Sequence, residues 1–416
     1  MSAAAPPVLD GVGPPGAARI PREALLLAAS IFLVIAATNI LTPLLPAIRD
    51  DFGISISTVG FIVGSYGLAR LAVDLPAGFL ADRVGHRRLS VIAFVILVAA
   101  SLVGFLAVSV EGLIVARVGA GLAVGILATV ILSALSATAT PANRGKVMSL
   151  FHVANNTGIA LYPLVGALVG LALGWRATFA VTLVLAVVAA AILLPLLLRI
   201  QLDGPGGGGR GSADPSLVLH GRDRRQAVIV TNFGVVANMI HRHGFRNTIL
   251  PLYAATTLGL GGLSIATAIA LMSVTGLLVA TPGGMLGDRI GRRRVITAGL
   301  AAVAVGDLVF LLTGDLLTFL LAAALIGFGD FFTSSQTALL SEVVPPEDRT
   351  KVLSTYRFSA DLGALIGPVV LAIVMDVANA QTAIVMAAAI LLTAALAARF
   401  GVPQPRVTTA AASPSP

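Results

Sequence analysis

The main ionisable side chains inside the long apolar stretches of this 416-residue chain are five arginines and four aspartates. They are Arg70, Asp74, Arg117, Arg242, Arg246, Asp307, Asp330, Arg357 and Asp361. A charge in an apolar environment costs free energy unless it is paired, so such residues mark a transport pathway, a proton relay or a partner charge. The near balance of sign predicts that most of them pair with one another.

Two of these arginines are each followed by an aspartate four residues later. On a helix this spacing places both side chains on one face. Arg70 precedes Asp74, and Arg357 precedes Asp361. A buried carboxylate beside an arginine can bind and release a proton as its surroundings change. We therefore expect the coupling proton of a transport cycle on Asp361, Asp74 or Asp330, with Arg70, Arg117 and Arg357 as partners; a purely structural Arg70–Asp74 pair is the alternative.

The stretch MIHRHGFR holds four basic side chains within eight positions. On an α-helix, Asn238, Arg242 and Arg246 form one stripe at four-residue spacing, whereas His241 and His243 face elsewhere. At about 1.5 Å per residue, Arg242 falls in the outer third of a membrane span and Arg246 close to its outer interface. Arg242 is expected either to contact substrate or a gate, or to form a structural pair with an aspartate.

The composition is that of a membrane protein. Hydrophobic residues make up 57% of the chain, charged residues 11%, and the mean hydropathy is +0.97. Since a span needs about 20 predominantly apolar residues, twelve can be marked. They are expected at 24–47, 56–81, 88–109, 111–138, 146–172, 175–199, 226–253, 263–286, 293–314, 316–340, 350–375 and 379–400. The predicted fold class is an all-α integral membrane protein with 12 transmembrane helices.

The distribution of basic residues predicts the orientation. With both termini inside, 20 of the 27 Lys and Arg fall in internal loops or tails, two (Arg49 and Arg176) fall outside, and five lie within spans. Basic residues concentrate in cytoplasmic loops of membrane proteins. We expect a multi-pass protein of the cytoplasmic membrane with cytoplasmic termini. The pI near 10.9 therefore indicates topology, and no nucleic-acid partner is expected.

An internal repeat divides the chain into two pseudo-symmetric six-helix halves. GFLADRVGHRR at 78 to 88 returns as GMLGDRIGRRR at 284 to 294, and PANRGKVMS returns as PEDRTKVLS. The Gly- and Pro-rich segment between the halves lacks helical periodicity. We expect a cytoplasmic disordered tail at 1–22, a six-helix half at 23–199, a cytoplasmic linker at 200–225, a second half at 226–400 and a disordered tail at 401–416.

The repeated loop motif G-x-x-x-D-R-x-G-x-R-R resembles the signature of the major facilitator superfamily, and the likeness covers essentially residues 23 to 400. The resemblance implies the major facilitator fold and a role for this loop in holding the halves together in one conformation and releasing them in another; a simple topology anchor is the alternative. The residues concerned are Gly78, Asp82, Arg83, Gly85, Arg87, Gly284, Asp288, Arg289, Gly291 and Arg292.

Two further motifs favour a branch of this superfamily. Residues 158 to 166 resemble the antiporter signature of 12-span drug:proton exporters, although Tyr162 replaces the glycine before Pro163. Arg117 matches the arginine of a pattern that the family associates with proton coupling, but Ala120 occupies its glutamine position. The resemblance implies a substrate cavity between the halves. Our candidates for its polar lining are Asn39, His152, Asn156, Tyr162, Asn238 and Arg242.

These observations predict a secondary active transporter working by alternating access, a proton-coupled exporter of amphipathic compounds or drugs. The alternative is a proton-coupled transporter of an organic anion or other metabolite, since several arginines could bind a carboxylate or phosphate. A receptor or scaffold on the same fold would leave the loop motifs without a role. The expected partners are a small-molecule substrate, protons and the lipid bilayer, with the protein acting as a monomer.

Other chemistries find little support. The chain has no cysteine, and no nucleophile and base occur at recognisable spacing, so we do not expect an enzyme. His241 and His243 point about 200° apart on an α-helix and cannot share a metal there. The glycine run of the linker lacks the GK[ST] ending of a phosphate-binding loop. We expect neither a metal site nor a cofactor.

Overall fold

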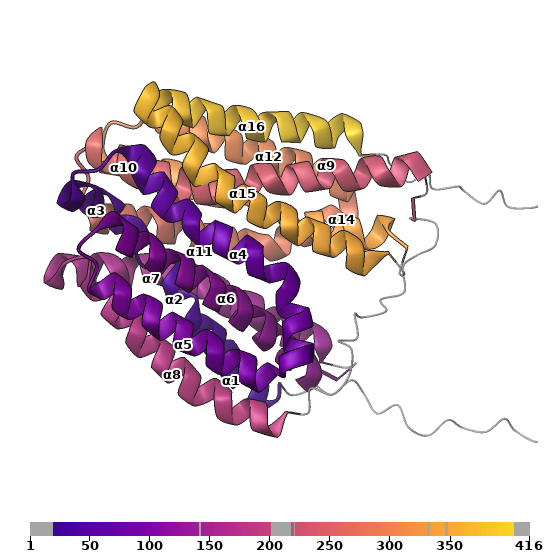
Figure 1. Cartoon of the computed structure of the whole chain (residues 1–416). Helices are drawn as coiled ribbons and strands as arrows, with labels where there is room; N and C mark the ends of the chain where they lie inside the picture. The colour runs from indigo at the N-terminus through magenta and orange to yellow at the C-terminus, as the bar shows by residue number, and fades with distance from the viewer. Residues whose placement is uncertain are drawn as a thin grey trace, which may run out of the picture.

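A computed structural model describes residues 20–140, 143–200, 218–219, 221–330, 333–345 and 348–402 of the chain. In this part of the chain the regular elements are all helices (Figure 1). The bilayer explains this, because hydrocarbon offers no hydrogen-bond partner and a helix satisfies its backbone groups internally. The molecule is an all-helical membrane protein, as predicted.

The first half of the chain folds into these elements: α1 (Arg22–Val34), α2 (Ala36–Asn39), η1 (Thr42–Leu44), α3 (Leu45–Phe52), α4 (Ile56–Val84), α5 (His86–Phe105), α6 (Val110–Thr138), α7 (Arg144–Leu173) and α8 (Ala177–Arg199). The second half contains α9 (Gly221–Met239), η3 (Ile240–Ile249), α10 (Leu250–Thr256), α11 (Gly262–Ile290), α12 (Arg292–Val309), η4 (Phe310–Leu312), α13 (Leu316–Gly329), α14 (Thr333–Val343), α15 (Arg349–Val377) and α16 (Ala380–Gly401).

Ten helices within the described residues are long and apolar enough to cross a membrane, against twelve predicted spans. The two other predicted spans are also helical but interrupted. The seventh is composed of α9, η3 and α10, with η3 a π-helix. The tenth contains α13 and α14, with residues 331–332 outside the described part. Polar residues and broken helices lower the apolar length of these two spans, which is typical of segments that line a cavity.

The two halves meet along α4 and α15, which lie next to each other in the middle of the molecule (Figure 1). Small residues allow the close approach. A Cβ at Gly60 would lie 2.5 Å from the Cβ of Ala372 and 2.6 Å from the carbonyl oxygen of Pro368. Without a hydrophobic driving force between helices in lipid, such close packing is a main source of helix association.

A carboxylate joins the halves at the end of the molecule opposite the chain termini, which we call the distal end. Asp376, near the end of α15, accepts hydrogen bonds from the backbone N–H of Ile56 at 3.1 Å and of Ser57 at 2.7 Å, and from the Ser57 hydroxyl. The first N–H groups of α4 have no partner within their own helix, and the helix dipole favours an anion there. Asp376 therefore stabilises contact between the halves at the distal end.

Replacing Asp376 by Ala should weaken this closure. An anion at a helix N-terminus contributes about 1 kcal/mol, so the distally closed population should fall about fivefold relative to the open one. The absence of cysteine makes the measurement direct, since spin labels at Val108→Cys and Leu312→Cys, both exposed, would be the only labels. Pulsed electron resonance should then record longer distances between them.

Asp315→Ala is the matched control, because Asp315 caps α13 within one half, through the backbone N–H of Thr318. An unchanged distance distribution for Asp376→Ala, or an equal change for Asp315→Ala, would contradict the assignment.

Candidate substrate cavity and its ion pairs

A cavity of about 270 Å³ lies between the two halves. Its walls come from the first half through α1, α2, α4, α6 and α7, and from the second through α9, η3 and α15. Its polar lining consists of Thr38, Asn39, Tyr66, Arg70, Asn155, Asn156, Arg242, His243, Arg246, Asn247 and Asp361. Aliphatic side chains such as Ile31, Ile35 and Ile159 complete the wall. The cavity thus offers apolar surface together with several charged groups.

Arg70 connects the halves at this cavity. Its Nε atom lies 3.4 Å from Asp74 on the same helix and 3.5 Å from Asp361 on α15. The predicted pair with Asp74 is present, while the partner of Asp361 is Arg70 instead of Arg357. Arg357 is exposed and forms no ion pair with any described residue. The interhelical contact between α4 and α15, which local spacing cannot reveal, selects the partner.

Arg117 is buried on α6 without a carboxylate among the described residues. Its Nη1 donates to the carbonyl oxygen of Ala37 at 2.9 Å, and its guanidinium lies 4.7 Å from the centre of the Tyr66 ring. Tyr66 in turn hydrogen-bonds Thr38 at 2.6 Å. A backbone carbonyl and an aromatic face both stabilise a cation. Arg117 therefore holds the broken first span, where α1 gives way to α2, against α4.

The π-helix η3 determines which side chains of the MIHRHGFR stretch face the cavity. A π-helix has wider turns than an α-helix, and π segments occur often at functional sites. Arg242, His243, Arg246 and Asn247 all line the cavity. His243, which α-helical geometry turns away from Arg242, is therefore a cavity residue, and that part of the sequence prediction is wrong. Asn238, on α9 just before the π segment, is fully buried and lies outside the lining.

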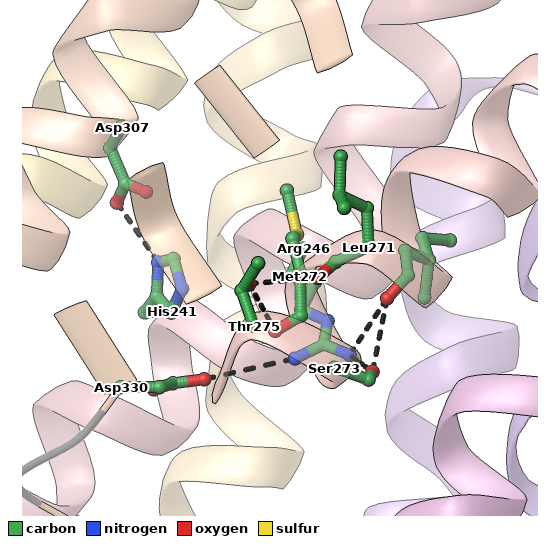
Figure 2. A network of polar contacts seen from close by, with 9 residues as sticks. His241, Arg246, Leu271, Met272, Ser273, Thr275, Asp307 and Asp330 are labelled. Carbon is green, nitrogen blue, oxygen red and sulfur yellow. Dashed lines mark hydrogen bonds and ion pairs between the residues drawn. The ribbon is translucent and has the colours of Figure 1, made fainter. Parts of the chain in front are cut away.

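Arg246 is a buried, paired residue and does not reach the membrane interface as predicted. Only 2% of it is exposed. Its Nη1 lies 3.8 Å from Asp330, and its Nη2 donates to the Ser273 hydroxyl and, at 3.4 Å, to the carbonyl oxygen of Ile269 (Figure 2). A carboxylate on the facing helix removes the need to snorkel, because it neutralises the charge where it lies.

His241 forms a second buried pair with Asp307 of α12, beside the first in Figure 2. The His241 Nδ1 and the Asp307 Oδ2 are 3.0 Å apart, and neither side chain is exposed. This contact joins η3 to α12, away from the cavity lining. It fixes one face of the π segment while Arg242 and His243 face the cavity.

Three of the six predicted lining residues, Asn39, Asn156 and Arg242, lie on the cavity wall. The other three do not. Tyr162 is buried against Phe32, with 5.2 Å between ring centres, His152 is exposed on α7, and Asn238 is enclosed by helix packing. Among the residues missed, Asn155 and Asn247 carried a usable signal, since each is an amide inside an apolar span.

Among the described loop motif residues, the hydrogen bonds and ion pairs lie within one half. Arg292 pairs with Asp288 and Glu342 and donates to the carbonyl oxygen of Gly284, all in the second half. In the first copy, Gly85 has φ 90°, matched by φ 94° at Gly291, and Arg83 and Arg87 are exposed. The Asp82 side chain lies outside the described atoms. The role of the motif in holding the halves together stays a prediction.

Two pseudo-equivalent helical halves around a central cavity lined by charged and apolar groups define a secondary membrane transporter. The chain belongs to the major facilitator superfamily, whose family model matches residues 27–241 and 233–416. Membership in this transporter family makes it a multi-pass membrane protein and not an enzyme.

Curated relatives are similar over only part of their length. The chain is 32% identical to a cephamycin export protein of Amycolatopsis lactamdurans over 36% of this chain and 31% of that one. It is 32% identical to a drug efflux pump of Mycobacterium tuberculosis over 39% of this chain and 32% of that one. The match thus spans about a third of each exporter. A human facilitated glucose transporter, member 10 of its family, is 27% identical over 63% of this chain and 51% of that one.

Solved structures share the fold. A peptide transporter aligns with a TM-score of 0.76 at 16% identity, over 92% of this chain and 95% of that one. A D-xylose-proton symporter aligns with a TM-score of 0.72 at 18% identity, over 92% of this chain and 98% of that one. At these identities the likeness establishes the fold alone.

The Arg246–Asp330 pair should be structural. Arg246→Gln deprives the buried Asp330 of its ion pair, and breaking such a pair costs roughly 3 kcal/mol. The variant should therefore unfold at a clearly lower temperature in detergent. Replacing both residues, as Arg246→Met with Asp330→Leu, should restore most of the loss, because no charge is then buried alone. A double variant no more stable than Arg246→Gln would contradict this account.

Proposed function

We propose that this transporter uses the proton gradient to export small amphipathic compounds, with Asp361 as the group that binds the coupling proton. The observation that carries the proposal is the position of Arg70, which lies between Asp74 at 3.4 Å and Asp361 at 3.5 Å. One carboxylate belongs to the same helix as Arg70 and the other belongs to the opposite half. A change at Asp361 therefore acts on the contact between the halves.

The coupling follows from elementary electrostatics. Ionised Asp361 attracts Arg70 and holds α15 against α4 on the cavity wall. A proton on Asp361 removes that attraction, while Arg70 keeps Asp74 as its partner, so no charge is left unpaired. Protonation thus releases the link between the halves at a low cost in free energy. Asp74 has the complementary role of holding Arg70 in place.

An amphipathic cargo is supported by the lining of the cavity. Aliphatic side chains from α1 and α7 face it together with asparagines and arginines. Two proteins similar to this chain are named as a cephamycin export protein and a drug efflux pump. Export, in turn, requires an orientation. We assign the end bearing the termini to the cytoplasm, since 20 of 27 basic residues fall on that side of the predicted topology.

Organic-anion transport is the second candidate. The specific observation in its favour is Arg242, which faces the cavity without a carboxylate partner among the described residues. The two candidates are compatible if the amphipathic cargo carries a negative group.

Asp361→Asn should abolish coupling without abolishing binding. In proteoliposomes with an imposed proton gradient, movement of an amphipathic dye and the accompanying proton flux should fall to the level of protein-free liposomes, because an amide cannot exchange a proton. Dye exchange at equal concentration and equal pH on both sides should persist. Asp50→Asn is the control, since the Asp50 side chain is 76% exposed and its ion pair with Arg49 is long, at 3.9 Å.

Asp74→Asn separates the two carboxylates. It should slow both gradient-driven transport and exchange, because Arg70 loses its positioning partner on α4. Full gradient-driven transport by Asp361→Asn would exclude Asp361 as the proton carrier, and proton flux retained in that variant but lost in Asp74→Asn would assign the role to Asp74.

A further inference from the structure

Three guanidinium groups line the cavity wall against one carboxylate among the described residues. They are Arg70, Arg242 and Arg246, and the carboxylate is Asp361. Arg70 is bonded to Asp74 and Asp361, and Arg246 pairs with Asp330, which lines a smaller cavity next to this one. Arg242 differs from both. Within the described part of the chain it has no hydrogen bond and no ion pair, so its charge faces the cavity without a partner.

An unpaired guanidinium in this position costs free energy. The charge of neighbouring Arg246 repels that of Arg242, and the half-buried side chain lies where water is limited. The other arginines of this region have partners: Arg70 and Arg246 have carboxylates, and Arg117 has a backbone carbonyl and the Tyr66 ring. A cavity wall that presents an unpaired guanidinium is instead complementary to a negatively charged group of a ligand.

Arg242 also stands at a junction. A smaller cavity of about 70 Å³ adjoins the first, and Asn156, Ile159, Arg242 and Arg246 line both. The small cavity continues along α11 past Met272 and Leu277. Ser273 and Asp330 also line it, and both contact Arg246. An amide donor thus lies beside the guanidinium, apolar side chains extend from it, and the carboxylate that lines this cavity is paired with Arg246. This arrangement matches a ligand with a charged oxygen group at one end and an apolar body at the other.

We propose that Arg242 binds the oxyanion of the cargo, a carboxylate or phosphonate on an apolar body, with Asn156 as a second hydrogen-bond donor. This inference rests on the proposed function, because it assumes that the cargo occupies the central cavity. It narrows the amphipathic class to amphipathic anions. Cationic amphiphiles are disfavoured, since they would place a second positive charge beside Arg242.

Four matched probes test the charge requirement: phenylbutyrate, phenylbutylphosphonate, phenylbutylamine and phenylbutanol share one apolar body and differ in the head group. In detergent, thermal stabilisation and titration calorimetry should detect binding of the two anions, with the amine and the alcohol at least about tenfold weaker. Comparison of phenylbutyrate with phenylbutylphosphonate decides between the two anion types. Equal or tighter binding of the amine, or no binding of either anion, would overturn the proposal.

Variants locate the site. Arg242→Gln should weaken binding of the preferred anion by about tenfold or more, and Arg242→Lys should lose less because it keeps the charge. Arg399→Gln, which removes the same charge from an exposed position at the far end of α16, should leave binding unchanged. Retention of anion binding in Arg242→Gln would reject Arg242 as the ligand-binding residue.

Stability without ligand distinguishes a binding role from a structural one. Removing an unpaired charge relieves its cost, so ligand-free Arg242→Gln should be at least as heat-stable as the unmodified chain. A structural arginine would show the opposite, with a fall like that expected for Arg246→Gln. A marked loss of stability in Arg242→Gln would therefore count against the site.

The same variants distinguish failure of the anion site from failure of the proposed proton coupling. Asp361→Asn should keep the difference between anion and amine while losing proton coupling. If Asp361→Asn transports normally but Arg242→Gln loses anion binding, the coupling assignment is wrong and the anion site stands. If coupling is lost as expected but anions never bind better than the amine, the anion site is wrong and the coupling assignment stands.

Discussion

The need to compensate charges buried in a low-dielectric interior organises this molecule. Arg70 with two aspartates, Arg246 with Asp330, and His241 with Asp307 each connect helices that are distant in sequence. Because an uncompensated charge in the membrane costs several kcal/mol, each pair fixes the relative position of its helices more strongly than apolar packing in lipid can. The ion pairs thus define which helices surround the cavity, and the apolar residues fill the space between them.

These contacts differ in whether they lie within one half or connect the two halves. The His241–Asp307 and Arg246–Asp330 pairs lie within the second half and keep the π segment joined to α12 and to the region where α13 ends. The Arg70–Asp361 pair instead crosses between halves, and so does the Asp376 contact with the start of α4. Bonds within a half can persist throughout a transport cycle. Bonds between halves have to break and form again for the cavity to open on alternate sides.

The spans, the fold class and the near balance of buried charge could be read from the sequence, because each depends on composition and local repeats. The tenth span and the seventh were also marked, although polar residues interrupt both. Partner choice could not be read, since Asp361 is four residues from Arg357 along one helix but pairs with Arg70 of another. The cavity-facing residues of the seventh span were predicted only in part. A spacing of 3.6 residues per turn does not hold through its π-helical segment.

The π-helix of the seventh span also determines how the side chains that follow it are oriented. Compared with an α-helix of the same axial length, a π segment accommodates additional residues, so every side chain after it points in a direction that a regular helix would not give. The tyrosine, proline and leucines of α10 owe their orientation to that offset. A deletion of one residue between Ile240 and Ile249 would rotate the side chains of the whole outer part of the span about the helix axis. Length in this segment, as much as residue identity, therefore encodes the shape of the cavity.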